Sequence, residues 1–133
     1  MDTKPDFRVI VAGGRDFNDY VLLKQVCDQM LENKKQTHQI TIVSGGARGA
    51  DALAMQYARD PSNDFNLVIM NANWELHGKS AGFIRNTEMA EFSNALIAFW
   101  DSGSKGTKHM IDTAKNKHLL RHVVSYKGTV LPV

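Results

Sequence analysis

The sequence is poor in cysteine and has no long hydrophobic run. Cys27 is the single cysteine of the 133 residues, which excludes an intrachain disulfide and a zinc site built on several cysteines, and favours a reducing compartment. No apolar run approaches the roughly 18 residues that cross a membrane, and the first residues lack the pattern of a signal peptide. We therefore expect a cytoplasmic protein with no membrane partner.

Net charge is also small, and several common catalytic motifs are absent. The chain has 16 Lys and Arg against 14 Asp and Glu, a net charge of +2, which led us to expect that nucleic acid is an unlikely partner. The five histidines show no H-E-x-x-H spacing, so we expect no metal site. There is no G-x-S-x-G elbow of a serine hydrolase. The length predicts a single domain over residues 1–133.

Apolar runs alternate with helical patterns along the whole chain. We predict strands over residues 7–13, 39–45, 65–72, 94–100 and 121–126 and helices over residues 20–33, 47–60, 80–92 and 107–117. Strands that are apolar throughout belong to parallel sheets covered on both faces. The sequence therefore predicts an α/β fold, a Rossmann-like three-layer sandwich with a parallel sheet of about five strands in the order 3-2-1-4-5.

Two local details of the helices can also be predicted. In the first helix the apolar spacing places Val21, Leu22, Val26, Met30 and Leu31 on one buried face. In the third helix, over residues 80–92, the hydroxyl of Ser80 suits an N-cap.

Glycines concentrate after three of the predicted strands. Seven of the ten glycines follow strands one, two and four: Gly13, Gly14, Gly45, Gly46, Gly49, Gly103 and Gly106. In the order 3-2-1-4-5 these strands are neighbours, and ligands of doubly wound sheets bind at their carboxyl ends. Glycine-rich turns that open helices offer free N–H groups and a positive dipole to phosphate. The alternative is that the glycines only make tight turns.

Four motifs together carry a resemblance to a known family. They are "VAGGRDF", "SGGARGADALA", "AGFIRNTEM" and "WDSGSKGTKHMI". They resemble the YspA-like, cpYpsA-related branch of the SLOG superfamily. The resemblance implies a Rossmann-type domain that binds a nucleotide or nucleotide-derived ligand. Relatives of this branch include the LOG phosphoribohydrolases and the DNA-processing protein DprA.

The LOG enzymes suggest which residues to compare. Their glycine-rich motif is matched here at Gly103, Gly106 and Thr107, and their arginine at Arg85. Met110 stands where those enzymes have a catalytic glutamate, and methionine can neither donate a proton nor stabilise an oxocarbenium ion. The resemblance therefore implies a retained phosphate site and makes LOG-type hydrolysis doubtful.

The candidate site combines the glycine turns with nearby polar side chains. The expected ligand- and phosphate-binding residues are Gly13, Gly14, Arg15, Ser44, Gly45, Gly46, Arg48, Gly49, Asp51, Arg85, Asn86, Gly103, Ser104, Gly106 and Thr107. Asp51 is also explained by the dipole of its helix alone. Arg85, Asp101 and Asp16 are the catalytic candidates, should the protein be an enzyme. We further predict that Gly46→Val abolishes ligand binding and leaves the domain folded.

Aromatic residues near these loops have alternative roles. Trp100 and Phe17 border the loops, where either could stack on a base or belong to the core. Trp74 and His77 form either a flap over the site or a plain surface loop.

Three functions are consistent with this pattern. The first is a sensor or accessory module that binds a small nucleotide-derived ligand and needs no obligatory cofactor. The second is a hydrolase that cleaves an N-glycosidic or phosphate bond with another acid, and the third is a DprA-like nucleic-acid-binding module. Because LOG-type proteins are dimers, we also expect a homodimer, with the helix over residues 80–92 as a possible interface.

Overall fold

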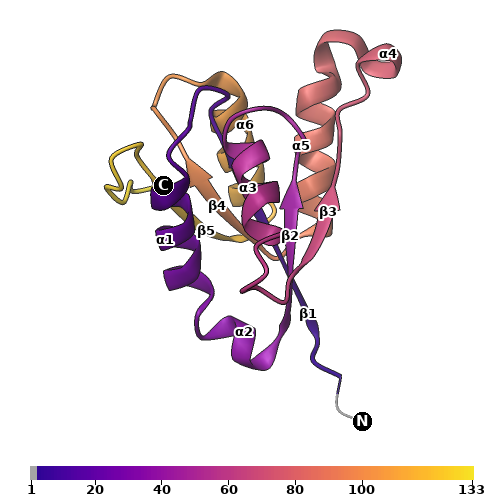
Figure 1. Cartoon of the computed structure of the whole chain (residues 1–133). Coiled ribbons are helices and arrows are strands. Elements are labelled where there is room, and N and C mark those ends of the chain that lie inside the picture. The colour runs from indigo at the N-terminus through magenta and orange to yellow at the C-terminus, as the bar shows by residue number, and fades with distance from the viewer. Residues whose placement is uncertain (1–2) are drawn as a thin grey trace.

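The computed structural model describes residues 3–133 and contains one parallel sheet. Its strands are β1 (Asp6–Gly13), β2 (Gln39–Ser44), β3 (Asn66–Ile69), β4 (Ala95–Phe99) and β5 (Leu120–Val124). They pair in the order β3-β2-β1-β4-β5, and each pair is parallel (Figure 1). The predicted fold class and strand order are confirmed.

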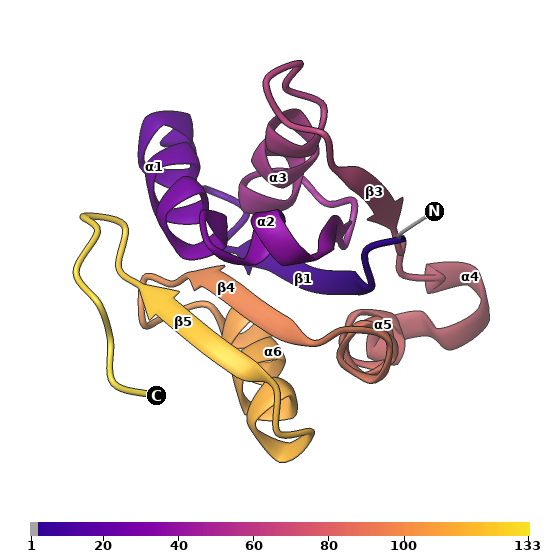
Figure 2. The same ribbon diagram turned by 90° about the horizontal axis from the view of Figure 1, so that it is seen from below.

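Helices cover both faces of the sheet. The helices are α1 (Tyr20–Leu31), α2 (Lys34–Thr37), α3 (Ala50–Ala58), α4 (Trp74–His77), α5 (Ala81–Phe92) and α6 (Lys105–Asn116), with a 3₁₀ turn η1 (Gly78–Ser80) before α5. Figure 2 shows α1, α2 and α3 on one face and α5 and α6 on the other. Because both faces are covered, the strands between them are apolar on both sides; every residue of β4 is buried.

The register of the central strands determines where the loops meet. Gly13, at the end of β1, pairs with Phe99, at the end of β4, and Ile10 pairs with Val43, one residue before the end of β2. The carboxyl ends of these three parallel strands therefore lie at one edge of the sheet. The loops that follow them converge there, as the glycine distribution predicts.

The buried face of α1 differs from the predicted one. Val21 is 77% exposed and Met30 is 43% exposed, while Leu23 and Cys27 are fully buried. The side chain of Asp19 accepts a hydrogen bond from the backbone N–H of Leu22 and caps the helix. Apolar residues occupy more than one side of this helix, so their spacing alone allows two faces, and packing against the sheet selects one.

Two helix boundaries also differ, for identifiable backbone reasons. Helix α3 begins at Ala50, because Gly49 before it has a φ of +77°, outside the helical region. Helix α6 begins at Lys105, because the Ser104 side chain accepts a hydrogen bond from the N–H of Thr107. The predicted cap at Ser80 is wrong: its hydroxyl makes no capping bond, since η1 runs directly into α5.

The end of the chain packs along the outer strand of the sheet. Val124 and Val130 form an antiparallel bridge, and the N–H of Leu131 donates to the carbonyl of Val123 at 2.8 Å. The segment after β5, which has no clear pattern in the sequence, thus covers part of an otherwise open sheet edge. None of the helices in residues 3–133 has the length and apolarity that crossing a membrane requires.

Candidate functional site

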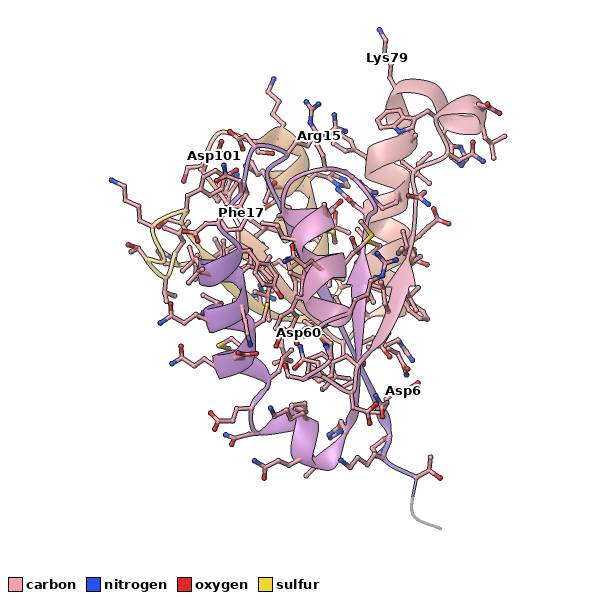
Figure 3. All side chains as sticks on the ribbon, viewed as in Figure 1. Asp6, Arg15, Phe17, Asp60, Lys79 and Asp101 are labelled. Atoms are coloured by element: carbon pink, nitrogen blue, oxygen red, sulfur yellow. The ribbon has the colours of Figure 1, made fainter. Side chains whose placement is uncertain are left out.

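A pocket of about 360 Å³ opens at the edge of the sheet where the loops converge. Its wall is built from the end of β1, the loop before α3, the start of α3, α4, α5 and the start of α6. Eight of the residues predicted from the sequence line it: Gly13, Arg15, Asp51, Arg85, Asn86, Ser104, Gly106 and Thr107. Figure 3 shows Arg15 and Lys79, which also lines the pocket, near this end of the molecule. The fold therefore brings together about half of the expected set.

The remaining candidates lie outside the pocket lining. These are Gly14, Ser44, Gly45, Gly46, Arg48, Gly49 and Gly103. Ser44 is buried, and its hydroxyl donates to the backbone carbonyl of Asp51 at 2.9 Å while accepting from the N–H of Gly46 at 3.2 Å. Arg48 is exposed on the loop before α3. Ser44 thus holds the loop before α3 in place from a buried position outside the pocket. Whether any of these seven residues binds a ligand stays a prediction.

Several loop glycines are required by the protein's own packing. A Cβ at Gly14 would overlap the hydroxyl of Tyr126, and one at Gly46, where φ is +74°, would overlap the side-chain oxygen of Asn71. The tight-turn alternative therefore accounts for Gly46, whose positive φ favours glycine, whereas at Gly14 the limit is the space that the Tyr126 side chain occupies. Gly46→Val would strain the fold itself and is not the clean test of binding that we expected. Gly106 is different, because open space surrounds it.

Arg85 brings a positive charge to the floor of the pocket. Its guanidinium donates to the carbonyls of Gly45 and Met70, and its Nε donates to the side chain of Asn86 at 3.2 Å. The three ion pairs formed by residues 3–133 do not include Arg85. Burial lowers the pKa of Arg85, but a guanidinium stays charged. The nearby charge of Asp51 favours the charged guanidinium but lies outside ion-pair distance, so Arg85 can still bind an anionic ligand.

Asp51 provides an acid in the same pocket. It lies in the first turn of α3 and is 6% exposed, and it lines the pocket as the sequence predicted. Its Oδ2 accepts a hydrogen bond from the N–H of Ala47 at 3.2 Å. Burial raises the pKa of Asp51, while the Ala47 hydrogen bond and the charge of Arg85 oppose the shift. At neutral pH the ionised carboxylate is therefore less stable here than in the unfolded chain.

This raised pKa leads to a prediction for Asp51→Asn. A carboxyl group whose pKa is higher in the folded state contributes stability at low pH and loses it as the pH rises through that pKa. The amide keeps the acceptor for Ala47 and removes the buried charge. We expect Asp51→Asn to have the wild-type Tm or a slightly higher one at neutral pH. In mild acid Asp51 of the wild type becomes protonated, so any excess in the Tm of the variant should disappear. Thermal unfolding followed by circular dichroism measures this; a fall of more than about 5 °C at neutral pH, over 1 kcal/mol, would contradict it.

The N-terminus of α6 forms another wall of the pocket. Ser104 caps the helix, with its Oγ 3.0 Å from the hydroxyl of Thr107. Gly106 in the first turn has no atoms of other residues near its Cβ position. A helix N-terminus with a small residue at its opening binds anions through its dipole and free N–H groups. Trp100 donates from its indole Nε1 to the carbonyl of Ser104 at 3.1 Å and packs against the core, which supports its core role.

Two exposed aromatic rings line the pocket. Trp74 on α4 is 52% exposed and Phe83 on α5 is 50% exposed. The ring of Phe83 stacks on His109 with centroids 4.1 Å apart and 9° between the planes. Phe17, in contrast, is 2% exposed and stacks on Phe99 at 4.8 Å, so it is a core residue and is not available to a base. Trp74 lines the pocket and His77 does not, so a flap formed by these two residues stays a prediction.

The two acidic catalytic candidates do not reach the pocket. Oδ1 of Asp101 accepts bonds from the N–H groups of Ser104 and Gly103, both at 2.8 Å, and these bonds lower its pKa. Asp16 accepts a hydrogen bond from the hydroxyl of Tyr126 at 2.6 Å. Neither lines the pocket beside Arg85, so a catalytic role for either of them stays a prediction. In the described part of the chain, residues 3–133, no three His, Cys, Asp or Glu side chains are placed to hold a metal ion.

Comparison with known proteins assigns the family. A model described as the YspA, cpYpsA-related SLOG family matches residues 7–77. The chain belongs to this family. A curated relative, the Gene 61 protein of Mycobacterium phage D29, is 33% identical over 112 residues, which cover 81% of this chain and 88% of the relative. The resemblance seen in the sequence motifs is therefore confirmed.

Two solved structures share the fold. DNA processing protein A of Helicobacter pylori, described for its unique single-stranded DNA binding mode, aligns with a TM-score of 0.65 and 20% identity over 89% of this chain. DprA of Streptococcus pneumoniae aligns with a TM-score of 0.64 and 19% identity over 92% of this chain. The SLOG chain spans 65% and 50% of their respective lengths.

These neighbours correct one expectation from composition. The inference that nucleic acid is an unlikely partner rested on the net charge of +2, and a protein of the same fold binds single-stranded DNA. Net charge was the wrong quantity to use. Binding depends on the local charge, and Arg15, Lys79 and Arg85 are gathered around one pocket.

Proposed function

We propose that this SLOG protein binds single-stranded nucleic acid and holds one backbone phosphate in the pocket. The observation that carries the proposal is Arg85, a partly buried guanidinium outside the ion pairs of the described residues, in a pocket that the N-terminus of α6 also lines. A phosphate would accept hydrogen bonds from both. It would also neutralise a charge that is otherwise costly to bury.

The rest of the pocket suits single-stranded nucleic acid better than an isolated phosphate. Arg15 and Lys79 add positive charge beside the phosphate position. Trp74 and Phe83 offer exposed rings, and base stacking on such rings combined with a cationic groove is the usual mode of single-strand binding. The DprA comparison supports the same partner.

A free nucleotide or nucleotide-derived ligand is the second candidate. The pocket volume of about 360 Å³ lies at the lower end of the range for small-molecule sites, which favours a ligand of mononucleotide size. Both candidates place phosphate at the same atoms and differ in whether neighbouring nucleotides add affinity. Hydrolysis of such a ligand, a homodimer, a cytoplasmic location and independence from a cofactor or metal stay predictions.

The salt dependence of binding tests the proposal. We expect labelled oligothymidylate to bind with an affinity that falls about 20-fold between about 50 and 200 mM salt, because three cations give a slope of about −2 for a single strand. Fluorescence anisotropy of the labelled strand measures this directly. Unlabelled oligothymidylate should compete far better than thymidine monophosphate. Equal competition by the monophosphate would favour the second candidate, and no binding of either would contradict both.

Two arginines provide a matched pair of variants for the same assay. Arg15 and Arg48 are both exposed loop residues, but only Arg15 lines the pocket. We expect Arg15→Met to reduce the salt slope by about 0.7 and Arg48→Met to leave it unchanged. Equal effects of the two substitutions would show a diffuse charge effect instead of a phosphate site in this pocket.

A further inference from the structure

Asp51 is unusual in a pocket that otherwise suits phosphate. Asp51 is only 6% exposed, and it lines the pocket together with Arg85. A carboxylate repels a phosphate in the same space. A first-turn acid would stabilise the helix dipole equally well from the surface, so the dipole does not explain its burial.

The hydrogen bonds of Asp51 leave one oxygen free. Among residues 3–133, the side chain accepts only the N–H of Ala47, at Oδ2. No protein donor contacts Oδ1. In the described residues, the side-chain atoms that are both fully enclosed and without a hydrogen-bond partner are Ser93 Oγ and Arg121 Nε, so Oδ1 of Asp51 is not fully enclosed. Oδ1 therefore keeps some accessible surface, and Asp51 lines the pocket. Ser44 holds the backbone carbonyl of Asp51 at 2.9 Å, which fixes this position.

Arg85 lies near Asp51 without pairing with it. Both side chains pack on Gly45: a Cβ there would lie 2.7 Å from Oδ2 of Asp51 and 2.5 Å from Nη1 of Arg85. The two charged groups nevertheless form no ion pair within 4.0 Å. Nε and Nη1 of Arg85 donate to protein acceptors, and among residues 3–133 Nη2 has no hydrogen-bond partner. The pocket thus presents a free acceptor on Asp51 next to a free donor on Arg85.

We propose that Asp51 accepts a hydrogen bond from a donor group of the bound nucleotide, so that the pocket recognises a hydroxyl or N–H group beside the phosphate held by Arg85. The proposal rests on the proposed function. Two nucleotide groups have this chemistry, the ribose 2′-hydroxyl and an N–H of the base. The hydroxyl would make the pocket selective for RNA over DNA, and the base N–H would make it selective among bases.

The geometry of Asp51→Asn makes a sharp test possible. The amide oxygen must take the place of Oδ2 to accept the N–H of Ala47. The amide NH₂ then faces the pocket in place of Oδ1. A donor of the ligand would meet another donor, and a preference for that donor should disappear, whereas contacts with phosphate oxygens should be kept or improved.

The experiment compares matched ligands on wild-type protein, Asp51→Asn and Asp112→Asn. Asp112 is an exposed carboxylate on α6 paired with Lys108, so its substitution controls for the lost charge. Anisotropy competition uses oligouridylate against oligodeoxyuridylate for the hydroxyl, and oligodeoxyuridylate against its N3-methyl form for the base N–H. We expect one pair to differ about ten- to a hundred-fold on the wild type. The same pair should be equal on Asp51→Asn and still different on Asp112→Asn.

Each outcome is decisive for Asp51. Equal affinities within both pairs on the wild type would overturn recognition of the 2′-hydroxyl and of the uracil N3–H. A preference that survives in Asp51→Asn would overturn the role of Asp51, and either result leaves the proposed function in place. Failure of every oligonucleotide to bind would overturn both. The wild-type comparison needs no variant, so it decides the question even if Asp51→Asn does not fold.

Discussion

Gly106→Glu is expected to lower the affinity for single-stranded oligonucleotides by about a hundred-fold or more without lowering the Tm. Gly106 lines the pocket in the first turn of α6, and open space surrounds its Cβ position. The carboxylate would occupy the place of the phosphate and repel it, at a cost of about 3 kcal/mol or more. Folding should not suffer, because glutamate is favoured over glycine in a helix and near its N-terminus. Anisotropy gives the affinity and thermal unfolding gives the Tm.

Lys105→Glu is the control for this substitution. Lys105 precedes Gly106 in the same turn but does not line the pocket. It changes the net charge more than Gly106→Glu does, yet we expect a loss below about ten-fold, because its charge is exposed to solvent and screened. If Gly106→Glu bound the oligonucleotide as the wild type does, the N-terminus of α6 would not be part of the site.

Gly49→Ala is expected to have the largest effect on stability, a loss of about 3 kcal/mol or more in the free energy of unfolding. Gly49 has a φ of +77°. A Cβ there would overlap the backbone of Gly14 and lie 2.5 Å from the carbonyl carbon of Arg15. Backbone atoms cannot move aside as a flexible side chain can, so the two loops would have to separate. Urea unfolding measures the loss, which corresponds to a fall in Tm of about 10 °C.

Gly78→Ala separates the clash from the backbone conformation. Gly78 also has a positive φ, of +56°, but nothing lies within 4 Å of its Cβ position. It should cost no more than about 1–2 kcal/mol, the penalty of the left-handed conformation alone. Similar losses for the two alanine variants would mean that the contact between the loops after β1 and β2 contributes little to stability.

The sequence was sufficient for the fold because its main signals are local and repeated. Five apolar runs alternating with helical patterns specify a parallel sheet, and the strand order is the one typical of Rossmann-like folds, in which the three glycine-rich loops are neighbours. What could not be predicted depends on packing between distant segments. Cys27 is fully buried and Val21 is exposed because of how α1 lies on the sheet, and the apolar spacing allowed either arrangement.

The candidate site was predictable in part for the same reason. Residues in the helix-opening turns, such as Gly106 and Thr107, line the pocket as the motifs indicated. Asp16 and Asp101 are acidic residues in the loops at the carboxyl ends of the strands, where a catalytic acid was expected. Each instead accepts a hydrogen bond from a donor in these loops. The burial of Asp51 depends on how the loop before α3 packs beside Arg85, and no local pattern carries that information.

The central claim is that a nucleotide phosphate binds between Arg85 and the N-terminus of α6. Titration of ¹⁵N-labelled protein with oligothymidylate, followed by two-dimensional NMR, tests it most directly. We predict that the largest shifts occur at the amides of Gly106 and Thr107 and at Nε of Arg85, with little change at Lys34 and Thr37 of α2, at the opposite end of the sheet. Saturable binding with shifts confined to other surfaces would contradict it.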